Sequence, residues 1–240
     1  MIINADDLDP TSSYKLLIGS VLPRAIAWIS TSSTDGVGNI APVSFFTVVG
    51  RIPPMLSVSL QPRSDGVTLK DTFVNIRDTE EFVVNIASVA QADALHRSAF
   101  EFESGVDEFD ALELTKAPSE TISAPRIAEA PISFECVVDR IIPMPPLPDH
   151  VVWGRVTRIH VRDDLYLSRG RIDVGALNAF GRLAGEYTLV NNIFSTPLPD
   201  GLADQLAAQR AERLDGKATT YSPLDTSEWS ASGATKEIVK

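Results

Sequence analysis

The chain has 240 residues, of which 44% are hydrophobic and 22% charged, a composition typical of a globular protein with a real core. Its formal net charge of −11 opposes binding to nucleic acid or to an anionic membrane surface. The only cysteine, Cys136, excludes an intrachain disulfide, and its apolar neighbours predict a buried core position. The N-terminus MIINADD lacks the features of a signal peptide, and no window is apolar enough for a membrane helix, so we expect a cytoplasmic protein.

Short runs of β-forming residues recur along the chain. Strands are expected at 25–30, 55–60, 82–86, 132–142 and 151–161. The proline-rich segment 143–149 predicts a turn, and the change of apolar face near 155–157 predicts a bulge.

Helical signals are fewer. Thr68 and Asp71 resemble a capping box that opens a short helix to about Ile76, with further helices expected at 89–98 and 202–214. Many short strands with helices only as inserts predict an all-β, closed or partly closed barrel.

Common catalytic motifs are missing. Gly36 and Gly38 lack the third glycine of a dinucleotide fingerprint, and no phosphate-loop lysine or Gly-x-Ser-x-Gly motif occurs. His96, His150 and His160 show no zinc-like spacing, so we assign them structural or solvated roles and expect no metal site. No side chain is assigned a catalytic role.

Polar residues gather between positions 23 and 75. A helix that begins near Lys70 would point its unpaired N–H groups outward, where they can bind phosphate. Lys70 and Arg63 add positive charge, and Ser59 and Thr72 add hydroxyl donors. Solvated surface positions are the alternative interpretation for the two cations.

The same region resembles the flavin reductase-like family, the FMN-binding split barrels. The similar blocks are LLIGSVLPRAIAWIST, GNIAPVSFFTVV, PPMLSVSL, LKDTFVNI and EFVVNIAS, followed by GVDEFDALELTKAP, FECVVDRI and VVWGRVTRIHV. The resemblance implies a six-stranded antiparallel split barrel of the Greek-key type, a homodimer, and FMN bound near the subunit interface. We expect residues 1–200 to form this domain and residues 201–240 to form a C-terminal helix and an extended tail.

The resemblance also implies roles for individual residues. Those matching the isoalloxazine and ribityl contacts are Asn39, Ala41, Pro42, Ser44 and Phe45. Those matching the phosphate end are Ser59, Arg63, Lys70, Asp71 and Thr72, with Asn75 closing that turn. Arg24 matches the arginine of a Pro-Arg-Pro block in which Ala25 replaces the second proline. Arg182 to Tyr187 resembles an Arg-Leu-Gly-Gly block and implies a weaker contact from a neighbouring subunit. Trp28 and Phe46 are assigned to the core, with stacking on the flavin as the alternative.

Three functions follow from this resemblance. The first is an NAD(P)H-dependent flavin reductase, with NADH or NADPH as donor, that uses bound FMN or supplies reduced flavin to a monooxygenase. The second is a non-catalytic FMN electron carrier of the flavoredoxin kind. The third is an FMN-binding module without turnover. From residue 215 onward, Tyr221 and Trp229 in a polar chain leave two interpretations of the tail open, a frayed terminus and an arm on the neighbouring subunit.

Overall fold

The computed structural model describes residues 2–190. One antiparallel sheet dominates it, with strand order β2-β1-β5-β8-β9-β4-β3. Its strands are β1 (Ala27–Ser32), β2 (Gly38–Val43), β3 (Phe46–Arg51), β4 (Pro54–Leu60), β5 (Glu81–Ile86), β8 (Ile132–Met144) and β9 (Asp149–Val161). The sheet therefore has seven strands where six were expected, although the all-β class is as predicted.

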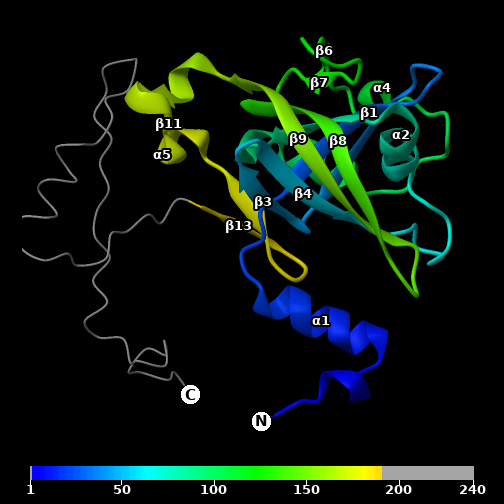
Figure 1. The fold of residues 1–240 in the computed structure, drawn as a ribbon. Helices are drawn as coiled ribbons and strands as arrows, with labels where there is room; N and C mark the ends of the chain where they lie inside the picture. The colour runs from blue at the N-terminus through cyan, green and yellow to red at the C-terminus, as the bar shows by residue number, and fades with distance from the viewer. Residues whose placement is uncertain (1, 191–240) are drawn as a thin grey trace, which may run out of the picture.

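The order of the strands closes the sheet into a barrel. β2 and β3 are the two edges of the sheet, yet only Ser44 and Phe45 connect them. Three residue steps span at most about 11 Å, so the edges must lie next to each other. A backbone bond from Ser59 N–H to the Phe45 carbonyl, 2.9 Å long, extends the β3–β4 pairing into this short connection. The sheet curls around its own core (Figure 1), and we call the junction between β2 and β3 the seam.

Alternating side chains divide the core in two. Ala27 and Ile29 of β1 point into the barrel, where they pack with Phe82, Cys136 and other residues. Trp28, on the other face of β1, is fully buried in a second cluster and donates from Nε1 to Ser98 Oγ at 2.9 Å. The core positions expected for Cys136 and Trp28 are confirmed, and Phe46 packs against the barrel core.

The long hairpin of β8 and β9 carries the predicted bulge. Glu135 pairs with Arg158 and Cys136 with Val156, so Thr157 is the extra residue. The strands extend further into the proline-rich segment than expected, since Pro143 still pairs with His150 and the ladder ends at the pair Met144–Asp149. Gly154 has a packing reason, since a Cβ there would lie 2.3 Å from the Phe82 ring.

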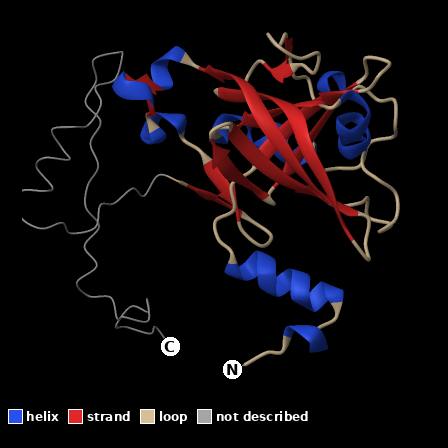
Figure 2. Cartoon of the chain, in the orientation of Figure 1, coloured by secondary structure: helices blue, strands red, loops and turns tan. Residues whose placement is uncertain are grey.

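Helices surround this sheet (Figure 2). They are α1 (Pro10–Ser20), α2 (Asp71–Thr79), α3 (Ala92–Arg97), α4 (Glu108–Ala111) and α5 (Val174–Leu177), with 3₁₀ turns at Ala5–Asp7, Val89–Gln91, Asp163–Leu165 and Ser168–Gly170. Short strand pairs complete the fold: β6 (Lys116–Ala117) with β7 (Arg126–Ile127), β10 (Tyr166–Leu167) with β11 (Arg171–Ile172), and β12 (Phe180–Arg182) with β13 (Tyr187–Leu189).

One helical prediction needs correction, and one helix was not predicted. The N-cap position of α2 is occupied by Lys70, which forms no side-chain capping bond, and not by Thr68, whose hydroxyl donates to Asp65 at 2.5 Å. α1 was not predicted, although Asp9 caps it and Pro10 occupies its first turn, a standard start signal. The domain boundary expected at residue 200, the helix at 202–214 and the tail from 215 lie outside the described residues.

Candidate functional site

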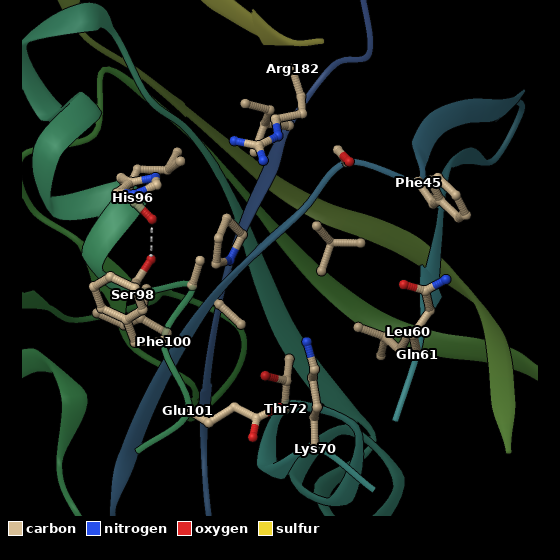
Figure 3. A pocket seen from close by; sticks show the side chains of 18 of the residues that line it. Phe45, Leu60, Gln61, Lys70, Thr72, His96, Ser98, Phe100, Glu101 and Arg182 are labelled. Carbon is tan, nitrogen blue, oxygen red and sulfur yellow. Dashed lines mark hydrogen bonds between the residues drawn. The ribbon is translucent and has the colours of Figure 1, made fainter. Parts of the chain in front are cut away.

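A pocket of about 260 Å³ opens at the seam of the barrel (Figure 3). One wall is the end of β2 with the connecting residues Ser44 and Phe45, and α2 begins at its base. The opposite side consists of α3, the following loop and the β12–β13 hairpin. The site is therefore built from segments that are far apart in sequence and that meet because the edges of the sheet meet.

The pocket brings together every predicted site residue except Asn75. Those lining it are Arg24, Asn39, Ala41, Pro42, Ser44, Phe45, Ser59, Arg63, Lys70, Asp71 and Thr72. Asn75 is buried one turn further along α2, where its Nδ2 donates to Thr31 Oγ1 at 3.0 Å. Its role is thus to fasten α2 to β1.

The beginning of α2 places two cations at the base of the pocket. Arg63 Nη2 forms an ion pair with Asp71 Oδ2 at 2.8 Å, and Nη1 donates to the Phe102 carbonyl at 2.9 Å. Lys70 forms no ion pair with any residue in the range 2–190. Its amine points into the pocket beside Thr72 (Figure 3). Of these two cations, Lys70 is therefore the one available to an anionic ligand.

A buried carboxylate lies behind this base. Glu108 of α4 accepts hydrogen bonds from Asn39 Nδ2 at 2.6 Å and from Ile40 N–H at 2.8 Å. Burial raises the pKa of the Glu108 carboxyl to about 7, against these two bonds. Nearby Asp71 raises this pKa further, whereas Arg63 lowers it. The side chain thus titrates near neutrality at the edge of the pocket.

Glu108 also fixes the direction of a hydrogen-bond chain. Because Asn39 donates its amide N–H to Glu108, its carbonyl oxygen faces Thr72 and accepts from Thr72 Oγ1 at 2.7 Å. A hydroxyl has a single proton, so Thr72 offers only lone pairs to the pocket. In this arrangement Asn39 uses the proton of the Thr72 hydroxyl, and the role of Thr72 as a donor to phosphate stays a prediction.

Arg24 joins three segments around the pocket. Its guanidinium donates to the Ile18 carbonyl at 2.6 Å, the Leu183 carbonyl at 2.8 Å and Ser44 Oγ at 3.3 Å. These bonds connect α1, the β12–β13 hairpin and the β2–β3 seam. Arg24 is therefore a buried residue that holds the wall in place, a role that sequence similarity did not indicate.

Sequence reasoning missed one side of the pocket. His96 was assigned a structural or solvated role, and the segment 182–187 a contact from a neighbouring subunit. In the structure His96, Phe100, Arg182 and Tyr187 line the pocket of the same chain. The aromatic residues Phe180 and Tyr187 belong to the short β12–β13 hairpin, but only the fold shows that this hairpin lies beside α3.

Two further absences concern the described residues only. No group of His, Cys, Asp or Glu within 2–190 could hold a metal ion. Within the same range, every helix is too short or too polar to cross a bilayer.

The sequence profile of the flavin reductase like domain matches residues 18–175. The chain belongs to the flavin reductase-like family. The expected split-barrel fold is confirmed. A protein of Aquifex aeolicus is 41% identical to this chain. The match covers 75% of this chain and 91% of the relative.

Solved structures of two family relatives align over nearly their whole length. Nitrilotriacetate monooxygenase component B from Bacillus cereus is 35% identical, with a TM-score of 0.78 over 82% of this chain and 98% of that one. The 2-nitrobenzoate 2-nitroreductase of Pseudomonas fluorescens is 29% identical, with a TM-score of 0.75 over 84% and 98%.

Proposed function

We propose that this protein is an NAD(P)H-dependent flavin reductase that binds FMN in the seam pocket. The observation that carries the proposal is the pairing, in one cavity, of a helix N-terminus bearing Lys70 with the strand end from Ala41 to Phe45. The first suits a phosphate, and the second suits a flat ring system. Membership of the flavin reductase-like family supports the same cofactor.

The chain's own residues have positioning roles in this proposal. The positive end of α2 and the Lys70 amine would bind the phosphate. The small side chain of Ala41 leaves the backbone of β2 accessible to polar groups of the ring. Phe45, Leu60 and Phe100 border the pocket with apolar surface and would exclude water from it.

No acid or base is required from the protein in this reaction. When bound, FMN supplies the centre that accepts a hydride at N5 from the nicotinamide C4. The protein contributes orientation and a dry cavity. His96, the histidine in the pocket wall, has its Nδ1 3.2 Å from the Tyr187 hydroxyl, which gives it a structural partner.

A second subunit fits the exposed surface around the pocket. On α1 only Ile18 is buried, whereas Tyr14, Leu16 and Leu17 are 43%, 43% and 57% exposed. Tyr14 also lines the pocket, so a chain that covered α1 would extend the wall of the site. We propose a homodimer on this basis, with a monomer mass in light scattering as the result against it.

Reduced flavin is proposed to serve a monooxygenase. The support is the 35% identity to a monooxygenase component B over nearly the whole of that chain. A carrier that keeps its FMN bound is the second candidate, and it would show no steady-state oxidation of NADH or NADPH when free FMN is added.

The test compares Lys70→Ala with Arg155→Ala, an exposed cation on β9 outside the pocket. Loss of one charge-assisted hydrogen bond should weaken FMN binding by about 1.5–3 kcal/mol and leave riboflavin binding nearly unchanged. Quenching of flavin fluorescence measures both affinities. Equal losses for the two ligands would show that Lys70 does not contact the phosphate, and no flavin binding by the wild type would refute the proposal.

A further inference from the structure

Two arginines occupy adjacent positions on one wall of the pocket. The backbones of Arg24 and Arg182 form an antiparallel bridge, with N–H to carbonyl distances of 2.9 Å in both directions. Both side chains line the pocket. Neither guanidinium forms an ion pair with a carboxylate in the described range 2–190.

The absence of a counter-charge matters most for Arg24, which is only 8% exposed. Its partners, two carbonyls and a hydroxyl, satisfy N–H groups without neutralising the charge. Buried charges in proteins usually have an opposite charge nearby. On a chain of net charge −11, this wall is thus a local positive region.

Arg182 is the member of the pair that is available to a ligand. Its guanidinium carbon lies 4.7 Å from the centre of the Tyr187 ring, which it covers. Tyr187 is held in turn by His96 Nδ1 at 3.2 Å from its hydroxyl and by the edge of Phe180, with ring centres 5.4 Å apart. This contact holds the guanidinium against the Tyr187 ring, and its N–H groups donate to no side chain or carbonyl of the described chain.

Arg182 lies across the pocket from Lys70. Figure 3 shows Lys70 and Arg182 reaching into the cavity from opposite sides. In the proposed function Lys70 and the beginning of α2 bind the phosphate of FMN, which leaves the arginine wall for a different anion. A reductase must also hold a second substrate beside its flavin, and that substrate needs its own anchor.

We propose that Arg182, fixed by Tyr187, binds an anionic group of the second substrate. The shared chemistry is an oxyanion, which a guanidinium recognises through paired N–H donors. It is supplied either by the diphosphate of the nicotinamide nucleotide or by the carboxylate of an aromatic electron acceptor. This inference rests on the proposed function, because it takes the flavin to be anchored at Lys70.

The test uses FMN-loaded protein and two redox-inert probes, ADP-ribose for the diphosphate and benzoate for the carboxylate. Binding of each is measured by calorimetry for wild type, Arg182→Gln, Arg182→Lys and the exposed control Arg155→Gln. Arg182→Gln should weaken at least one probe by about tenfold or more. Arg182→Lys should recover part of the loss, because it keeps the charge without the planar stacking on Tyr187.

The probe that loses affinity identifies the source of the anion, and either result supports the proposal. FMN affinity, measured separately, should stay within about twofold of wild type in Arg182→Gln. The proposal is overturned if neither probe binds, if neither responds to Arg182→Gln, or if FMN affinity falls as much as probe affinity. Failure of wild-type protein to bind FMN would instead refute the proposed function itself.

Discussion

The pKa values of two buried glutamates in this protein are shifted in opposite directions. Glu108, beside the pocket, accepts two hydrogen bonds, and burial raises the pKa of its carboxyl to about 7. Glu135, on β8, is fully buried as well. Burial also acts to raise the pKa of Glu135, but hydrogen bonds from Thr121, Glu120 and His160 outweigh it and lower the pKa to about 2.

The difference lies in the number of donors. Glu135 accepts from the Glu120 N–H at 2.7 Å, from the Thr121 N–H at 2.8 Å and hydroxyl at 2.6 Å, and from His160 Nε2 at 2.6 Å. Such a set replaces the water that an ionised carboxylate loses on burial. Glu135 is therefore a fixed charge that fastens the loop at 119–123 to the barrel, whereas Glu108 can change its charge next to the site.

The largest expected effect is that of Glu135→Gln. The amide cannot accept from every donor now directed at the carboxylate, so several polar groups would be left unsatisfied. Breaking such an arrangement should lower the free energy of unfolding by about 3–5 kcal/mol. Urea denaturation at pH 7 measures it, with the exposed Glu103→Gln as control. A cost below about 1 kcal/mol would contradict the role assigned to Glu135.

Glu108→Gln should have a smaller effect that depends on pH. The folded pKa of Glu108 lies above its ordinary value of 4.5, so the folded state binds the proton more tightly than the unfolded state. Its contribution to stability is therefore full below about pH 4.5 and is lost as pH rises through 7, by up to about 3 kcal/mol. The variant has an amide in place of the carboxyl group, so position 108 does not titrate in this pH range.

The measurement is the urea midpoint of both proteins from pH 5 to pH 8. Stability of the wild type should fall relative to Glu108→Gln across this window. Parallel curves would show that Glu108 does not titrate in it. For Glu135 we expect a pH dependence of stability with the opposite sign and in a lower pH range. Because its pKa is lowered, its contribution to stability is present above about pH 4.5 and is lost as pH falls towards 2.

Local patterns in the sequence predicted much of the barrel, and the family resemblance predicted one half of the site. Alternating apolar residues marked β1, β4, β5, β8 and β9, which is readable because the alternation depends on neighbours within a few positions. The predicted residues that line the pocket, from Arg24 to Thr72, were assigned through the blocks that resemble the flavin reductase-like family.

The rest depends on contacts between distant segments. Glu108 meets Asn39 across 69 positions, and Arg24 meets Leu183 across 159. No local signal distinguishes Glu108 from an exposed helical glutamate, so neither its burial nor its effect on Thr72 could be foreseen. Similarly, the 182–187 hairpin was expected to reach the site from another subunit because only the fold shows that it pairs with Arg24.

The smallest expected effect, and the sharpest test of the donor argument, is that of His160→Gln. Glu135 would keep its bonds from Glu120 and Thr121 and would stay ionised at neutral pH, so the loss should be only about 1 kcal/mol. If His160 acts through Glu135, the same substitution should cost less in a Glu135→Gln background, and the double-mutant cycle gives the coupling between the two side chains. Urea denaturation of the four proteins at pH 7 provides these values. A loss as large as that of Glu135→Gln would mean that His160 alone keeps the carboxylate ionised, and additive losses would mean that the 2.6 Å contact contributes nothing to stability.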